Sequence, residues 1–385
     1  MINMQRKDGP MKLMKITIII MTLMISVSAQ AVNWIAFAVA PSAQDQQSPD
    51  IHDNTIVWQQ LDAGDWDIYA ADITDPYNPA VFPVAVFEDD QTEPAVYADT
   101  VVWQDFIATD WAIVGTKLDD IGNVFTIADY EQDQTNPAIY ENTVIWQDNY
   151  YGDWDICAAD ITIPDTPVET LVTPFEDDQT NPAIYQNTVL WQHGSAPDID
   201  IYAVDISDTA NLQHFLVAGF NLDQQTPAVF GSTVVWDDNF FGDSDIFSAD
   251  IYETARPIEN AIISKSLSQT NPDIDGHIIV WQDDRNGNWD IFGFNLTTGK
   301  EFVITDDPFD QINPAISGNV AVWQDNRDGP QNIYAVILDG PEVAQCLAKP
   351  VGDVNGDCMV NMTDFAAISA HWLECNLQPQ EVCWQ

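Results

Sequence analysis

The chain has 385 residues, and its 61 Asp and Glu against 11 Lys and Arg give a formal net charge of −50 at pH 7. So negative a field repels phosphate backbones and anionic lipid, which excludes nucleic acid and anionic membranes as partners and leaves cations and neutral ligands open. Apolar residues make up 46% of the chain and 14 residues are Trp, which excludes a disordered acidic polymer and predicts a folded protein.

The first predicted element is an export signal over residues 1–31. Four Lys and Arg residues precede an apolar run at 16–27, and small residues follow at 28–31, where a signal peptidase cuts. The alternative is an uncleaved membrane anchor, but the run is shorter than the roughly 20 residues that span a bilayer. We therefore expect a secreted or cell-surface protein, with the periplasm as a further location.

Between residues 32 and 340 the chain repeats one unit of about 45 residues, a period typical of β-propeller blades. A proline stands nine residues before, and an isoleucine ten residues after, one tryptophan in every unit. The seven tryptophans in register are Trp58, Trp103, Trp146, Trp191, Trp236, Trp281 and Trp323.

The third unit illustrates the strands that we predict in each blade. A short first strand follows the proline at 138–140, and the β-branched segment ending at Trp146 predicts a second strand covered on both faces. A hairpin at 148–153 leads to a third strand at 155–161. Differences in unit length all fall after the third strand, so the loop to the fourth strand takes the insertions.

The seventh unit ends without a fourth strand, whereas residues 34–39 form a strand-like segment ahead of the first repeat. We predict that this segment completes the last blade, which closes the ring and removes an open edge. The predicted fold class is all-β, a seven-bladed β-propeller closed by an N-terminal strand. The alternative is an open array of seven sheets.

The order of proline, strand, Gly-containing hairpin and Asp-Ile-aromatic segment resembles the TolB-like (PD40/WD40-like) propellers. Segments 67–69, 200–202 and 290–292 match that pattern, and the resemblance covers roughly residues 33–339. It implies the propeller fold. It leaves the function open, since related propellers include binding scaffolds and polysaccharide lyases.

Two aspartate motifs recur along the repeat, and the strand order places both on one face of the disc. One lies in the turn that enters each blade, and we predict that its carboxylates ring the mouth of the central channel. Its members are Asp90, Asp133, Asp178, Asp223 and Asp310. Such a ring would hold a cation or a polyol. The alternative is structural, because Asp in a tight turn accepts hydrogen bonds from its own backbone.

The second motif is an aspartate two residues after the Trp, in the hairpin, which His193 replaces in the fourth unit. A residue that breaks the symmetry of the ligand face is a candidate for function. Trp154 and Trp289 belong to the same hairpins and suit stacking on sugar rings, or else pack against neighbouring hairpins. The histidines occupy unrelated positions in the repeat, so we expect no catalytic centre.

Cysteines separate into one in the body of the chain and four near its end. Cys157 takes a place that is Tyr or Phe in most units, which predicts a buried free thiol. Cys346, Cys358, Cys375 and Cys383 allow three disulfide pairings, and the sequence does not choose among them.

After a linker at 341–352, oxygen ligands follow one another with the spacing of an EF-hand-type calcium loop. The predicted Ca²⁺ ligands are Asp353, Asn355, Asp357, the carbonyl of Met359, Asn361 and Asp364. With the helix-like segment at 365–373, the tail at 353–385 resembles half of a type I dockerin. That resemblance implies a cohesin-like protein partner, although dockerins usually have two loops and a glycine is common where Cys358 stands.

The sequence thus predicts a monomeric, secreted or surface-attached, non-catalytic propeller that binds a glycan or a partner protein. The calcium-binding tail would serve attachment or assembly of a complex. The alternative is a carbohydrate-active enzyme or an accessory protein in polysaccharide breakdown.

Overall fold

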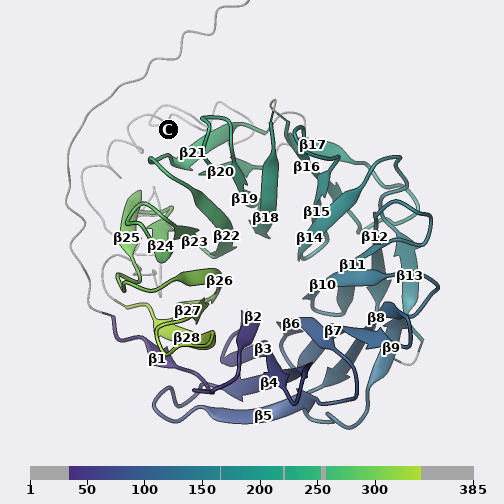
Figure 1. Cartoon of the computed structure of the whole chain (residues 1–385). Coiled ribbons are helices and arrows are strands. Elements are labelled where there is room, and N and C mark those ends of the chain that lie inside the picture. Colours follow the sequence, from purple (N-terminus) through teal and green to yellow (C-terminus); the bar gives the residue numbers. More distant parts are fainter. Residues whose placement is uncertain (1–33, 165, 220–221, 253–256, 340–385) are drawn as a thin grey trace, which may run out of the picture.

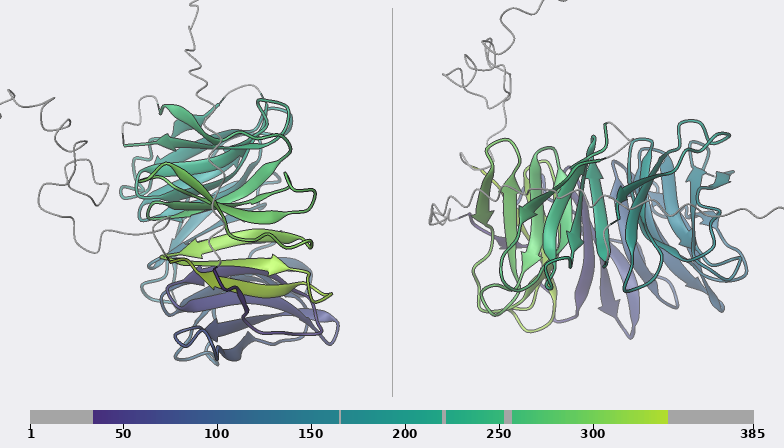
Figure 2. Two further views of the ribbon diagram at one scale, coloured as in Figure 1. Left: turned by 90° about the vertical axis from the view of Figure 1, so that its left-hand side faces the viewer. Right: turned by 90° about the horizontal axis from the view of Figure 1, so that it is seen from above.

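In the computed structural model, residues 34–164, 166–219, 222–252 and 257–339 form seven four-stranded antiparallel sheets arranged around a central channel (Figure 1). Seen from the side, the sheets stack around the ring as the blades of a disc (Figure 2). The predicted seven-bladed propeller is confirmed. None of the described segments is a helix long and apolar enough to cross a bilayer.

The strands run outward from the channel in sequence order in the first six blades, and in the seventh the outer strand is β1. The inner strands are β2 (Gln46–His52), β6 (Gln91–Tyr97), β10 (Gln134–Tyr140), β14 (Gln179–Tyr185), β18 (Gln224–Phe230), β22 (Gln269–Asp275) and β26 (Gln311–Ser317). The second strands are β3 (Thr55–Asp62), β7 (Thr100–Ile107), β11 (Thr143–Asp148), β15 (Thr188–His193), β19 (Thr233–Asp238), β23 (Ile278–Asp283) and β27 (Val320–Asp325). The third strands are β4 (Asp65–Asp72), β8 (Asp110–Lys117), β12 (Asp155–Asp160), β16 (Asp200–Asp205), β20 (Asp245–Asp250), β24 (Asp290–Asn295) and β28 (Asn332–Ile337). The outer strands are β5 (Ala80–Ala85), β9 (Phe125–Ala128), β13 (Val168–Leu171), β17 (Phe215–Ala218), β21 (Glu259–Ile263), β25 (Lys300–Val303) and β1 (Phe37–Ala38).

The last blade is completed from the other end of the chain, as predicted. Strand β1 pairs with β28, with Phe37 opposite Ala335 and Ala38 opposite Tyr334. The N–H of Val39 then donates to the carbonyl of Ile333 at 2.8 Å. The regular pairing is shorter than the predicted segment 34–39.

The inner strands differ from the prediction, because they begin before the proline and not after it. In the third blade β10 starts at Gln134, and a bulge between Thr135 and Ala138 accommodates Pro137, which has no N–H to offer the ladder. The residue before the proline has a φ between 46° and 56° in all seven blades. The inner strand is therefore a bulged strand with the proline inside it.

This bulge also links the blades to one another. The N–H of each pre-proline residue donates to the polar side chain that follows the Trp of the preceding blade, as Asn181 does to Gln147 Oε1 at 2.8 Å. The same bond crosses the closure of the ring, from Ser48 to Gln324 Oε1 at 2.9 Å. In the fifth blade Asp237 replaces the glutamine and accepts from Asn271 at 3.4 Å. A set of seven equivalent bonds thus holds the ring closed.

The hydrophobic core lies between adjacent blades. All seven repeated tryptophans have no exposed surface, and the second strands are buried on both faces, as their apolar runs predict. At the closure, Trp58 of the first blade packs in one cluster with Val322 and Ile333 of the seventh. Removing one of these indoles from water stabilises the interface between two blades.

The strand order gives the disc two different faces. The hairpins between second and third strands and the connections into the next blade lie on one, here called the hairpin face. The turns between first and second strands and the loops between third and fourth strands lie on the other, here called the turn face. The loops that take the insertions are therefore on the turn face.

Candidate functional site

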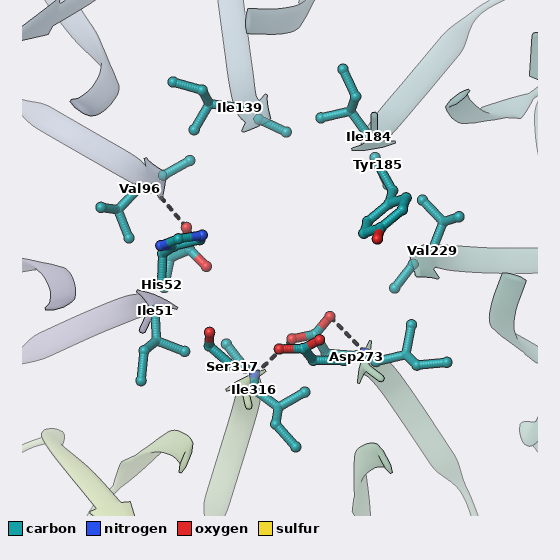
Figure 3. Close-up of a pocket in the computed structure, with 18 of the residues that line it drawn as sticks. Ile51, His52, Val96, Ile139, Ile184, Tyr185, Val229, Asp273, Ile316 and Ser317 are labelled. Atoms are coloured by element: carbon teal, nitrogen blue, oxygen red, sulfur yellow. Dashed lines mark hydrogen bonds between the residues drawn. The ribbon is translucent and has the colours of Figure 1, made fainter. Parts of the chain in front are cut away.

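The central channel forms a cavity of about 820 Å³. All seven inner strands line it, from the pre-proline residues to the beginning of the turns that follow (Figure 3). Each inner strand is the edge of its sheet. Its backbone polar groups on that edge therefore face the channel, and those that no neighbouring blade binds can serve a ligand.

At the turn face, five ring side chains from consecutive blades form what we call the aromatic arc: His52, Tyr97, Tyr140, Tyr185 and Phe230. Each is the last residue of its inner strand and is half-buried. Neighbouring ring centroids lie 4.2, 4.8, 5.0 and 4.6 Å apart in blade order. Figure 3 shows the His52 and Tyr185 side chains directed into the channel. Asp275 and Ser317 occupy the same position in the remaining two blades.

Two half-buried carboxylates break the symmetry of the channel wall. Asp50 and Asp273 stand where the other five blades have Ala, and they flank the seventh blade. Each accepts a bond from the next inner strand at 2.7 Å, Asp50 from the N–H of Val96 and Asp273 from that of Ile316. Burial raises the pKa of Asp50 to about 7 and that of Asp273 to about 6. One side of the channel is therefore acidic.

At the hairpin face, the pre-proline residues form a polar ring around the channel. Its members are Ser48, Glu93, Asn136, Asn181, Thr226, Asn271 and Asn313. Side chains bond round the ring, Asn136 Nδ2 to Asn181 Oδ1 at 3.0 Å and Asn271 Nδ2 to Asn313 Oδ1 at 2.8 Å. The two ends of the channel therefore differ, one aromatic and one amide-rich.

The predicted turn aspartates are placed differently from the expectation. Their carboxylates accept hydrogen bonds from the backbone of the preceding blade's hairpin and do not line the channel. Asp90 Oδ1 accepts from the N–H of Trp66 at 2.9 Å, and Asp178 Oδ1 from that of Trp154 at 3.1 Å. Asp133, Asp223 and Asp310 make the equivalent bond. These bonds dock five of the hairpins on the next blade, and a ligand role for the five residues stays a prediction.

The hairpin residues have mainly internal partners. Asp283 Oδ2 and Asp325 Oδ2 accept from the indole N–H of the Trp two residues earlier, at 3.1 and 3.0 Å. His193 has no such bond and packs edge-on against Tyr202, with centroids 5.1 Å apart. Trp154 and Trp289 are half-buried at the hairpin face. Ligand binding by His193 and the two tryptophans is likewise a prediction still.

Cys157 is free among the described residues, as predicted, but it is half-buried and not fully buried. Burial, and then the charges of Asp148 and Asp155, raise the pKa of its thiol. A protonated thiol is a poor nucleophile, so these surroundings disfavour reaction at this cysteine.

The predicted export signal at 1–31 and the calcium loop at 353–364 lie outside the described residues, as do the linker and the rest of the dockerin-like tail. Within the described ranges, no group of three or more His, Cys, Asp or Glu side chains is arranged to hold a metal ion.

Sequence reasoning missed the aromatic arc and the acidic wall. A signal for both was present, because the third residue after each repeat proline is His, Tyr, Tyr, Tyr, Phe, Asp or Ser in blade order. The residue directly after the repeat proline is an aspartate in only two blades, at Asp50 and Asp273. Only the placement of these positions on the channel gives that pattern a meaning.

The sequence matches no family model and no curated protein. Several solved structures have a similar fold. An oligogalacturonate lyase from Vibrio parahaemolyticus aligns with a TM-score of 0.58 at 11% identity, over 82% of this chain and 96% of its own. The β-propeller domain of the Trilobed protease from Pyrococcus furiosus aligns with a TM-score of 0.58 at 8% identity, over 80% of this chain and 97% of its own.

A puromycin-hydrolysing peptidase of Mycobacterium tuberculosis aligns with a TM-score of 0.59 at 10% identity, over 76% of this chain. This chain spans about half the length of that peptidase and of a prolyl endopeptidase, at 50% and 46%. Identities this low establish a shared fold alone. The protein is thus a seven-bladed β-propeller whose fold is shared with these peptidases and the oligogalacturonate lyase.

Proposed function

We propose that this protein is a non-catalytic binding propeller that holds a neutral glycan at the turn-face end of its channel. The observation that carries the proposal is the aromatic arc beside carboxylates in one channel mouth. Aromatic faces stack on the C–H faces of sugars, while carboxylates and backbone carbonyls accept bonds from sugar hydroxyls. Stacking and acceptors together suit a polyol.

The charge of the channel supports a neutral ligand over an anionic one. Asp50, Glu93, Asp273 and Asp275 all contribute to its lining. A polyanion such as an oligogalacturonate would be repelled there, because like charges in a cavity of low dielectric interact strongly. The similarity to oligogalacturonate lyases therefore supports the fold and not their substrate.

A glycan array followed by calorimetry tests the proposal. We expect a neutral oligosaccharide to bind, and the Tyr140→Ala, Tyr185→Ala double variant to bind it about tenfold more weakly or worse, which is about 1.4 kcal/mol. Tyr77→Ala is the matched control, because Tyr77 is 95% exposed and lies outside the channel. Equal affinity of the double variant and the wild type would exclude the channel as the glycan-binding site.

The same samples discriminate binding from catalysis. A reducing-sugar assay on every oligosaccharide that binds is expected to stay at the blank level. Release of reducing ends would replace this proposal by the alternative of a carbohydrate-active enzyme.

We also propose that the protein is exported and that its tail binds Ca²⁺ for attachment or for assembly with a cohesin-like partner. Both proposals rest on sequence motifs, the segment 1–31 and the ligand spacing from Asp353 to Asp364. A mature N-terminus at residue 32 in protein recovered outside the cell supports the first.

Calcium titration of the full chain tests the tail. We expect one tight site that the Asp353→Ala, Asp357→Ala double variant lacks. Because the whole chain is acidic, the control is Asp119→Ala, Asp208→Ala, which changes the charge equally at exposed sites of the propeller. Identical titrations of the two double variants would show that the loop is not a specific site.

A further inference from the structure

Two blades carry an internal arginine whose surroundings define a cation site. In the sixth blade Arg285 donates from Nε to Asp283 Oδ1 at 2.8 Å, and its Nη1 forms an ion pair with Glu301 Oε1 at 2.6 Å. Its guanidinium lies over the Phe292 ring, 4.2 Å from the centroid. The site thus combines a hairpin carboxylate, an outer-strand carboxylate and an aromatic face.

The seventh blade repeats the arginine, the hairpin carboxylate and the ring, while its second carboxylate comes from the connection between β25 and β26. Arg327 pairs with Asp325 and with Asp307, the latter at 3.5 Å, and lies 4.6 Å over the Tyr334 ring. In both blades the arginine is the fourth residue after the Trp, and the ring is the residue paired with that Trp across the second and third strands. A blade of this repeat therefore has a built place for a guanidinium group.

The third blade keeps the carboxylates of this place but not the arginine. Asp148 corresponds to Asp283 and Asp325, two residues after the Trp. In each blade, one residue of the third strand lies opposite the Trp. Glu169 and Glu301 each pair with the residue two positions after that one, so the two glutamates correspond. Tyr150 stands at the arginine position, and Cys157 stands opposite Trp146 at the position of the ring.

These replacements leave a cavity of about 280 Å³ in the third blade. Cys157 is smaller than the Phe or Tyr it replaces, and Tyr150 is 52% exposed at the rim, whereas the Arg285 side chain is 19% exposed. Tyr130 and Tyr151 complete the wall, with Tyr150 and Tyr151 centroids 5.0 Å apart. The space of the missing guanidinium is thus open and framed by rings.

A buried acceptor without a partner faces this cavity. Asp155 is 5% exposed, and its Oδ1 has no hydrogen-bond partner in the described structure. A buried acceptor that lacks a hydrogen bond lowers the stability of the fold. Burial raises the pKa of Asp155 to about 6, with Asp153 and Asp148 adding to the effect, so a cation placed here would relieve an unfavourable charge.

We propose that this third-blade pocket binds a guanidinium group supplied from outside the chain, held between Asp148, Asp155 and Glu169 and stacked on the tyrosines at its rim. The chemistry is that of an arginine side chain, and the source is either a free guanidinium compound or an arginine of a partner protein. The pocket lies on the outer part of one blade, so the inference is independent of the glycan proposed for the channel.

Calorimetric titration with ethylguanidinium chloride, in about 0.15 M salt to screen the bulk charge, tests this inference. We expect saturable binding that Asp155→Asn and Glu169→Gln each weaken about tenfold or more. The capped peptide Gly-Gly-Arg-Gly-Gly is the second arm. Tighter binding of the peptide than of ethylguanidinium identifies a partner arginine as the source, and weaker binding identifies a free compound.

Tyr150→Arg gives the sharpest comparison, because it restores the arginine of the sixth and seventh blades and fills the pocket from within. We expect this variant to fold, to melt at a higher temperature than the wild type and to bind no ethylguanidinium. Tyr77→Arg adds the same charge at an exposed site and is expected to bind like the wild type. Undiminished binding by Tyr150→Arg, or an equal loss in Tyr77→Arg, would overturn the proposal. In the Asp353→Ala, Asp357→Ala background, binding of Ca²⁺ that Tyr150→Arg abolishes, with no binding of ethylguanidinium, would also overturn it.

Discussion

Asp237→Asn is expected to stabilise the propeller by about 2 to 4 kcal/mol at about pH 8 and to leave its stability unchanged near pH 4. Asp237 is 3% exposed and stands where the other blades have Gln in the bond between blades. Its carboxylate accepts from the Thr226 hydroxyl and from the N–H of Asn271. Asn keeps the acceptor oxygen and removes the charge.

The sign follows from the direction of the pKa shift. Burial raises the pKa of Asp237 from 3.8 to about 7 in the folded protein. Its favourable contribution is fully present below the unfolded pKa of about 4 and is lost as the pH rises through about 7, because the folded state then holds a buried charge. Since one pKa unit is worth about 1.4 kcal/mol, a shift of this size corresponds to a few kcal/mol.

Urea denaturation of wild type and variant across this pH range gives the free energies of unfolding. The difference between the two proteins is the readout, because Asp50 and Asp273 keep their own pH dependence in both. Asp119→Asn, at an exposed position, is the control and should change nothing at either pH. A pH-independent difference between Asp237→Asn and wild type would contradict the prediction.

Val39→Asp is expected to destabilise the propeller by about 3 to 5 kcal/mol, because it places an unpaired charge in the core that closes the ring. Val39 is 2% exposed and packs between the seventh and first blades in one cluster with Ile51 and Val320. Its N–H bond to Ile333 continues the pairing of β1 with β28. The substitution therefore disrupts both the closure of the ring and the hydrophobic core.

Ile35→Asp is the matched control for that variant. It introduces the same charge four residues earlier, at a side chain that is 85% exposed, and should cost less than about 0.5 kcal/mol. Unfolding free energies from urea titration measure both. Equally small effects would mean that the N-terminal segment contributes little to the stability of the ring.

Much of the fold could be predicted because its information is local and repeated. A Pro, a Trp and an Ile at constant spacing, with β-branched residues between them, specify one strand pattern seven times. Burial of every one of these tryptophans confirms that the repeat encodes the interface between blades. The start of the inner strand was predicted wrongly, because a proline suggests a strand end until the bulge that accommodates it is seen.

The candidate site could not be predicted in the same way. Asp90 and Asp50 are both acidic residues near the start of an inner strand, yet Asp90 reaches back to the Trp66 backbone of the preceding hairpin and Asp50 lines the channel. The direction of a side chain relative to the channel depends on the bulge and on the twist of the blade. Neither the bulge nor the twist can be inferred from the residue type alone.

By itself, the sequence determined the number of blades, the residues that pack between them and the closing of the ring by the N-terminal segment, since periodic burial leaves a periodic pattern. Only the tertiary structure decided which residues meet. His52 and Phe230 lie far apart along the chain but belong to one arc. The pocket of the third blade becomes apparent when that blade is compared with the sixth and seventh, where an arginine fills the equivalent space. Such contacts arise when the ring closes and brings equivalent positions of different blades into one frame.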